Sequence, residues 1–245
     1  MKLPEKEKAA YKAAFREMSL AQKADHIYTY YKWPIFLAVC LLIVLGSTLH
    51  RNLTKKEPVV YLAFANVAVG QDLERALTED SLAAAYPGEK RVEVYLYKDL
   101  YLSENADTLN HEYAYASRMK TLGAMEAQKM DLVILNREAY DLFSQHGFLE
   151  DLPALLEEAD PALLERLRPI LCTNSVTESD NFLDWQLGEA EEHTVVTSEA
   201  ENAILLNDLP LFKSAGFPGE IYLGLIPNSP RQDASLQYLR YLLGD

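Results

Sequence analysis

Cysteine is nearly absent from this sequence, which contains only Cys40 and Cys172 in 245 residues. Cys40 lies inside a long apolar run and Cys172 lies far beyond it, so we expect no disulfide between them within one chain. A small fold held together by disulfides is therefore excluded. Residues 58–245 form a segment that is long enough to bury a hydrophobic core of its own.

Recognisable catalytic motifs are also missing. The sequence has no G-x-S-x-G, no glycine-rich phosphate loop, no H-E-x-x-H and no C-x-x-C. Its five histidines are scattered. His146 precedes Gly147, a position typical of a last helical turn, where a positive charge interacts favourably with the helix dipole. We therefore predict a protein that is not an enzyme and that has no metal site and no cofactor.

Basic residues are scarce, with 23 Lys and Arg against 37 Asp and Glu and a net charge of −14. This balance excludes nucleic acid as a partner and disfavours anionic lipid. No Lys or Arg lies between Arg168 and Lys213, where nine acids occur: Glu178, Asp180, Asp184, Glu189, Glu191, Glu192, Glu199, Glu201 and Asp208. Because their spacing matches no calcium loop, we predict a solvated hairpin or loop here and not a cation site.

One long run without charge stands out, at residues 33–50. Trp33 to Leu49 spans about 25 Å as a helix, and the preceding turn of tyrosines extends it into the headgroup zone. We predict a single transmembrane helix that contacts the lipid bilayer. A buried helix of a soluble protein is disfavoured because the run is apolar on every face. A cleaved signal peptide is disfavoured because its charged region would exceed thirty residues.

The distribution of basic residues predicts the orientation of this helix. Seven precede it: Lys2, Lys6, Lys8, Lys12, Arg16, Lys23 and Lys32. Three follow it closely: Arg51, Lys55 and Lys56. The excess places the N-terminus in the cytoplasm and residues 58–245 outside the membrane.

Residues 1–32 are expected to form an amphipathic cytoplasmic head. One helix is predicted over residues 5–17, and a capping box at Ser19 and Gln22 predicts the start of a second. Leu20, Ala24, Ile27 and Tyr31 form an apolar stripe on it. This helix is expected to lie on the membrane surface and to turn into the bilayer at Pro34, although an ordinary solvated helix explains the pattern as well. Residues 51–57 are expected to be a polar linker.

Strands and helices alternate in the first half of residues 58–245. The predicted strands are residues 59–65, 91–96 and 131–136. The predicted helices are residues 72–86, 107–129 and 137–146. On the long helix, Leu109, Tyr113, Ala116, Met119 and Leu122 are expected to share the inward face. This order predicts an α/β domain of three layers around a parallel or mixed sheet.

The second half is less regular. Residues 152–171 are predicted to be helical with a break at Pro161. Short strands are expected at residues 203–206 and 221–226, and a last helix is expected to open at Pro230, with Ala234, Tyr238 and Tyr241 or Leu242 on one face.

Three segments of this domain resemble the type 2 extracellular solute-binding proteins, the membrane-tethered receptors of ABC importers. Residues 114–135 look like that family's helix leading into a strand that starts with Asp and apolar residues. Residues 138–152 are similar to the segment that follows, and residues 222–243 are similar to the family's C-terminal ending. The short stretch between Leu152 and Ala203 leaves no room for a second lobe. The resemblance therefore implies lobe one alone, in a bacterial plasma membrane, with a permease as partner.

A ligand site is expected beyond the carboxyl ends of the predicted strands, where loops converge in open α/β sheets. The residues there are Asn66, Tyr97, Lys98, Asn136 and Arg137. The asparagine amide both donates and accepts hydrogen bonds, and the tyrosine ring offers a face for stacking. The arginine guanidinium can bind a carboxylate through two hydrogen bonds. Alternatively, Asn136 is the N-cap of the helix that follows, and Tyr97 packs with its hydroxyl exposed.

Two functions of different class follow from these observations. The first is a membrane-anchored, non-enzymatic, solute-binding-like module that binds a small polar ligand weakly or docks on a membrane partner. The second is an accessory or assembly subunit of a membrane or cell-envelope complex. An extracytoplasmic enzyme built from dispersed residues is a third and less favoured alternative.

Overall fold

The computed structural model describes residues 16, 18–103, 111–187 and 191–244. The chain divides into two compact units, Met1–Lys55 and Lys56–Asp245, and each is considered separately. In the first unit, α2 (Leu20–Thr54) is one continuous helix. Its capping box is confirmed, because Ser19 Oγ accepts a hydrogen bond from the Gln22 amide and Gln22 Oε1 accepts one from the Ser19 amide.

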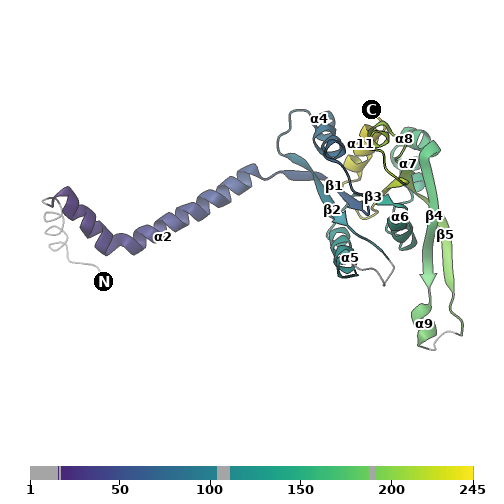
Figure 1. The fold of residues 1–245 in the computed structure, drawn as a ribbon, viewed down its shortest axis with the longest axis horizontal. Coiled ribbons are helices and arrows are strands. Elements are labelled where there is room, and N and C mark those ends of the chain that lie inside the picture. The colour runs from purple at the N-terminus through teal and green to yellow at the C-terminus, as the bar shows by residue number, and fades with distance from the viewer. Residues whose placement is uncertain (1–15, 17, 104–110, 188–190, 245) are drawn as a thin grey trace. The chain divides into compact units, whose positions relative to one another are not determined.

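Three expectations for this unit need comment. Pro34 lies inside α2, and Figure 1 shows a bend in the N-terminal part of this helix; the expected turn into the bilayer at Pro34 stays a prediction. The linker expected at residues 51–57 is shorter than predicted, because the helix extends to Thr54 and the first strand begins at Glu57. The helix at residues 5–17 falls mostly outside the described residues, and in the apolar stripe only Leu20 has a described side chain, which is exposed.

Residues Lys32–Asn52 form a 21-residue part of α2 that is long and apolar enough to cross a membrane. At 1.5 Å per residue this part measures about 31 Å, the thickness of a hydrocarbon core. A signal sequence near an N-terminus has the same length and composition. The helix is therefore compatible with the predicted anchor.

The second unit is built on one six-stranded mixed sheet with the order β2-β1-β3-β6-β5-β4. Its strands are β1 (Glu57–Ala65), β2 (Val92–Leu100), β3 (Leu132–Asn136), β4 (Leu171–Asp180), β5 (Val195–Leu205) and β6 (Ile221–Leu225). β1 pairs in parallel with both β2 and β3, as predicted. β6 is antiparallel to β3 and to β5, and β4 and β5 form an antiparallel hairpin.

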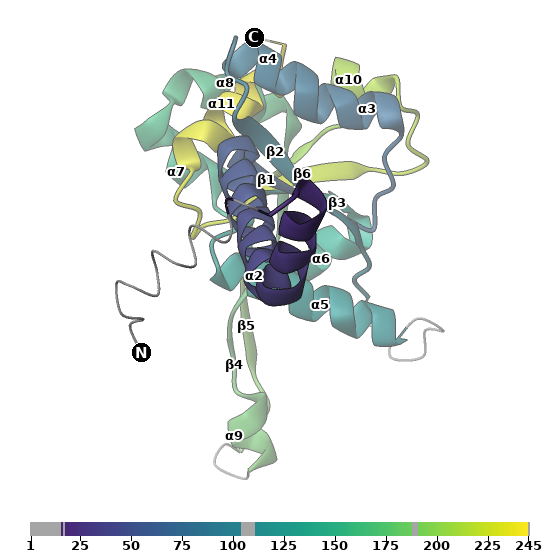
Figure 2. The same ribbon diagram turned by 90° about the vertical axis from the view of Figure 1, so that its left-hand side faces the viewer.

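Helices cover both faces of the sheet, so the three-layer arrangement is confirmed (Figures 1 and 2). The helices described in this unit are α3 (Gln71–Arg75), the π-helix η1 (Ala76–Asp80), α4 (Ser81–Ala85), α5 (His111–Glu126), α6 (Arg137–Gln145), α7 (Leu152–Ala159), α8 (Pro161–Leu167), the 3₁₀ turn η2 (Arg168–Ile170), α9 (Phe182–Gln186), α10 (Pro210–Lys213) and α11 (Gln232–Leu242), of which α9 lies at the end of the β4–β5 hairpin and not on the sheet. One hydrophobic cluster packs α3, α7, α8 and α11 on one face. A second packs α6 on the other face, where α5 also lies.

The predicted elements mostly exist, with shifted ends. The helix at residues 72–86 is interrupted by η1, and the break at Pro161 separates α7 from α8. The last helix begins at Gln232, two residues after Pro230, and it buries Tyr238 and Leu242 as expected. The hairpin alternative for the acidic segment is confirmed, because β4 and β5 form an antiparallel pair between residues 171–180 and 195–204.

The inward face predicted for α5 is wrong. Its buried side chains are Ser117, Thr121 and Ala124, whereas Tyr113, Met119 and Leu122 are exposed, and Leu109 lies outside the described residues. Small side chains let the helix approach the sheet closely, and Ser117 Oγ accepts a hydrogen bond from the Tyr101 amide at 3.1 Å. The large apolar side chains of α5 are consequently exposed, on the same helix as the exposed Arg118 and Lys120.

Candidate functional site

The carboxyl ends of β1 and β3 adjoin a solvent-open hollow of about 440 Å³. β1 lies between β2 and β3 in the sheet. The chain therefore runs from β1 to one side to form β2 and then crosses to the other side of β1 to form β3. Such a switch point is where open α/β sheets bind ligands. Asn66 and Asn136 both line the hollow, together with Asp99, Tyr101 and Tyr113. Two of the five predicted site residues are therefore brought together.

The side chains of these two asparagines are already used by the fold. Asn66 Nδ2 donates to the Leu102 carbonyl at 2.6 Å, and its Oδ1 accepts from the Leu102 amide at 2.8 Å. Asn66 also has a φ of 57°, in the left-handed region that asparagine tolerates. Asn136 is the N-cap of α6, with Oδ1 accepting from the Ala139 amide at 2.9 Å. The N-cap alternative for Asn136 is thus confirmed.

Tyr97 and Lys98 do not lie beyond the end of a strand, because β2 continues to Leu100. No strand-ending residue follows Leu96, and β2 continues because it pairs with β1 as far as Leu100. The Tyr97 ring packs with those of Tyr61 and Tyr95, with centroids 6.3 and 5.1 Å away, and burial is the main cause that raises its pKa. Lys98 forms an ion pair with Glu74. These two expected positions for ligand residues are corrected.

Arg137 is also engaged within the fold. Its Nε lies 3.0 Å from Asp141 Oδ1, and its Nη1 donates to the Tyr222 hydroxyl at 3.4 Å. Its guanidinium carbon lies 5.7 and 5.8 Å from the ring centroids of Tyr140 and Tyr222. The hydrogen bond with Tyr222 is the main cause that raises the pKa of Arg137. A carboxylate ligand would have to compete with Asp141 for the guanidinium of Arg137.

The predicted hairpin is an arm formed by β4, α9 and β5, and sequence reasoning missed the exposed apolar side chains at its end. Figures 1 and 2 show the hairpin extending past the other elements of its domain, with α9 at its end. The exposed side chains near this end include Phe182, Leu183, Trp185 and Leu187, which we call the arm tip. Leu183 is 68% exposed and Leu187 is 73% exposed. The four large apolar residues within 182–187, where the sequence is Phe-Leu-Asp-Trp-Gln-Leu, were the available signal.

The arm tip is held by specific contacts. Asn181 Oδ1 accepts from the Thr194 amide at 2.6 Å, and Asn181 Nδ2 donates to the Glu192 carbonyl at 2.9 Å. His193 Nε2 lies 2.8 Å from Asp180 Oδ1, and this hydrogen bond is the main cause that lowers the pKa of Asp180. The His193 ring stacks on Trp185, with centroids 5.7 Å apart. The tip therefore presents its apolar side chains from a defined structure.

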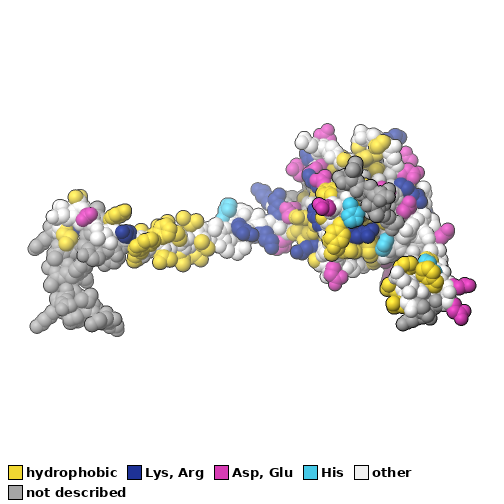
Figure 3. All heavy atoms as spheres, turned by 60° about the horizontal axis from the view of Figure 1, so that its bottom comes forward, with side chains coloured by type: hydrophobic (Ala, Val, Ile, Leu, Met, Phe, Trp, Pro, Cys, Tyr) yellow, Lys and Arg dark blue, Asp and Glu magenta, His cyan; other side chains and the backbone are white. Residues whose placement is uncertain are grey.

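The surroundings of the arm tip are acidic. Figure 3 shows hydrophobic and histidine side chains at the end of the arm, with acidic side chains on its outer edge. Among the described residues, no three His, Cys, Asp or Glu side chains gather as they would around a metal ion. The acidic segment thus surrounds an apolar tip in this structure.

Comparisons with known proteins do not add a family. Neither the scan against protein-family models nor the search of curated proteins finds a match. Function is therefore argued from the geometry of this chain alone.

Proposed function

We propose that this protein is a membrane-anchored, non-enzymatic module that docks on a partner protein through the arm tip. The helix at Lys32–Asn52 anchors it, and the excess of basic residues before this helix supports a cytoplasmic N-terminus with the α/β domain outside. The observation that carries the proposal is the arm tip itself. Phe182, Leu183, Trp185 and Leu187 are exposed together at the end of a projecting hairpin.

The chemistry of the arm specifies its partner. Because Lys and Arg are absent from residues 169–212, the tip favours a surface with an apolar groove rimmed by Lys and Arg. Trp185 is the side chain best suited to fill such a groove, since tryptophan is enriched among residues that dominate binding energy. A permease or another protein of the same membrane or envelope fits this requirement. Anionic lipid does not, because the acids would be repelled.

Weak binding of a small polar ligand is the second candidate function. It is favoured by the hollow at the switch point between β1 and β3 and by the resemblance to the solute-binding proteins. It ranks below docking because Asn66, Asn136 and Arg137 all have partners within the fold. A site of this kind would rely on Asp99, Tyr101 and Tyr113 instead.

The docking proposal is tested by photocrosslinking of the full chain in its native membrane. A benzoylphenylalanine replaces Leu183 in the arm tip, and a matched control replaces Glu157, an exposed residue of α7. We expect one discrete adduct with a membrane or envelope protein from position 183 and none from position 157. Trp185→Ala should reduce this adduct, and high salt should weaken it because the acidic surround is screened.

Three outcomes would contradict the docking proposal: adducts with lipid alone, equal labelling from positions 183 and 157, or no adduct at position 183. An adduct whose contact segment lacks Lys and Arg would contradict the stated chemistry of the partner.

A further inference from the structure

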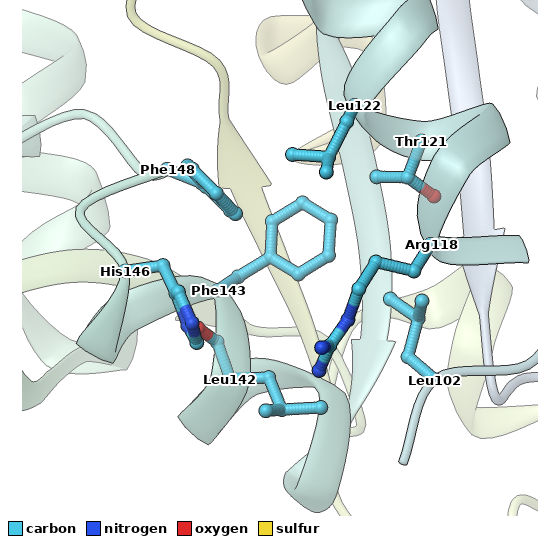
Figure 4. A pocket seen from close by; sticks show the side chains of 8 residues that line it. All are labelled: Leu102, Arg118, Thr121, Leu122, Leu142, Phe143, His146 and Phe148. Carbon is cyan, nitrogen blue, oxygen red and sulfur yellow. The ribbon is translucent and has the colours of Figure 1, made fainter. Parts of the chain in front are cut away.

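A second and separate cavity of about 220 Å³ lies between α5 and α6. Figure 4 shows the side chains around it, which come from both helices and from the segments that follow β2 and α6. Five of the eight lining side chains are apolar, and three of these, Leu102, Leu142 and Phe143, are each less than 10% exposed. The volume suits one aromatic ring or a short alkyl chain. Apolar walls with a few polar groups at the mouth are typical of small-molecule sites.

The end of α6 fixes one side of this pocket. Gly147 has a φ of 66°, its amide donates to Ser144, and the Phe148 amide donates to Phe143. These are the two hydrogen bonds of a Schellman cap. The rings of Phe143 and Phe148 meet edge to face, with centroids 5.9 Å apart. The pocket wall is thus set by backbone geometry and is present before any ligand binds.

Two basic side chains lie among the residues that line the pocket, and none of the lining residues is acidic. In Figure 4, the Arg118 side chain reaches from α5 toward the space between Leu102 and Leu142, and it has no ion pair or hydrogen bond with another described residue. His146 donates from Nδ1 to the Leu142 carbonyl at 2.8 Å and stacks on Phe148, which leaves Nε2 unbound. The chain as a whole has a net charge of −14, whereas the lining of this pocket has basic side chains and no acidic ones.

We infer that the pocket between α5 and α6 binds a small amphipathic carboxylate. Its apolar part lies among Leu102, Phe143 and Phe148, and its carboxylate pairs with the guanidinium of Arg118 at the mouth. His146, at the C-terminal end of α6, is the other basic side chain of the lining. This inference is independent of docking through the arm tip, because no residue of the arm lines the pocket.

The test uses 3-phenylpropanoate as the probe and the full chain in nanodiscs of zwitterionic lipid. Calorimetric titration, with empty nanodiscs as the blank, should give a dissociation constant of roughly micromolar to millimolar. The uncharged amide of the same acid should bind more weakly. Arg118→Ala should weaken binding of the acid roughly three- to tenfold, since the guanidinium is exposed and partly screened. It should leave binding of the amide unchanged.

Matched variants on the same helix separate the pocket from the general surface. Lys120→Ala removes one charge outside the pocket lining and should not change binding. Leu122→Trp should fill the pocket and abolish binding, whereas Met119→Trp, at another exposed position of α5, should not. Leu122 is 37% exposed, so its replacement is compatible with folding. Thr121→Val keeps the shape of the wall and should preserve binding.

Several results would overturn the inference. No detectable binding of 3-phenylpropanoate to the wild-type chain would exclude the site. Equal affinity for the acid and the amide, or unchanged binding in Arg118→Ala, would exclude the role of the carboxylate. Full binding to Leu122→Trp would show that the probe binds elsewhere.

Discussion

Arg231 forms a two-point ion pair with the buried carboxylate of Asp131. Its Nε lies 2.9 Å from Oδ2 and its Nη2 lies 2.9 Å from Oδ1, and the Asp131 side chain is fully buried. Asp131 also accepts hydrogen bonds from the Tyr61 amide and the Ser229 hydroxyl. The pair joins the start of β3 to the segment before α11, one hundred residues later in the chain. It closes the domain by holding its last helix to the sheet.

Replacement of Arg231 by alanine should therefore be strongly destabilising. It leaves Asp131 buried with a negative charge and without its cation, which costs about 3 kcal/mol of unfolding free energy. Urea denaturation of residues 56–245 checks this value. Arg240→Ala, which removes a pair with Asp160 whose cation is 47% exposed, is the matched control and should cost clearly less than Arg231→Ala. Equal losses from both variants would show that the Asp131 pair is not structurally important.

Replacement of Ile134 by aspartate should unfold the domain. Ile134 is fully buried in β3, with Phe64 and Leu223 as its neighbours across the sheet. A charge at this position has neither water nor a partner, and the expected cost exceeds about 5 kcal/mol. Circular dichroism of residues 56–245 measures the outcome. Val196→Asp, at an exposed position of β5, should leave the spectrum and the melting temperature nearly unchanged.

Stability should fall as the pH rises above about 10. Tyr238 is buried, its hydroxyl donates to the Leu77 carbonyl at 2.6 Å, and burial raises its pKa well above the usual value. The unfolded chain therefore loses this proton first, so stability is complete below pH 10 and declines above it. Tyr238→Phe should cost about 1 kcal/mol at neutral pH but should flatten this decline.

The effect is measured as the difference between the urea midpoints at about pH 8 and at about pH 10.8. These values lie below and above the usual tyrosine pKa of about 10. Tyr115→Phe, at an exposed position of α5, is the control and should keep the wild-type slope. A slope above pH 10 that is the same in Tyr238→Phe and in the wild type would contradict the account.

The parts of the fold with strong local signals were predictable from the sequence. The apolar runs of β1 and β3 indicated buried strands, and Asn136 and Gly147 marked both ends of α6. The face of α5 was not predictable, because its buried side chains are small and partly polar and the large apolar ones are exposed. β4 was missed because its sequence is mostly polar and it becomes a strand by pairing with β5.

The candidate sites, like the fold, could be predicted from the sequence only in part. The switch point followed from the order of strands, and Asn66 and Asn136 do line its hollow. Their hydrogen bonds to Leu102 and Ala139 depend on tertiary and capping geometry, which the sequence pattern does not reveal. The pocket between α5 and α6 joins Arg118 to His146 through helix packing, and no spacing in the sequence brings them together.

The position of the α/β domain relative to the membrane is the central claim, because an arm tip that meets an envelope or permease partner must lie outside the cytoplasm. The most direct measurement is a reporter enzyme that is active only outside the membrane, fused either after Asp245 or before Met1. The seven basic residues before the apolar helix predict activity for the fusion after Asp245 and none for the fusion before Met1. Activity only for the fusion before Met1 would contradict the account.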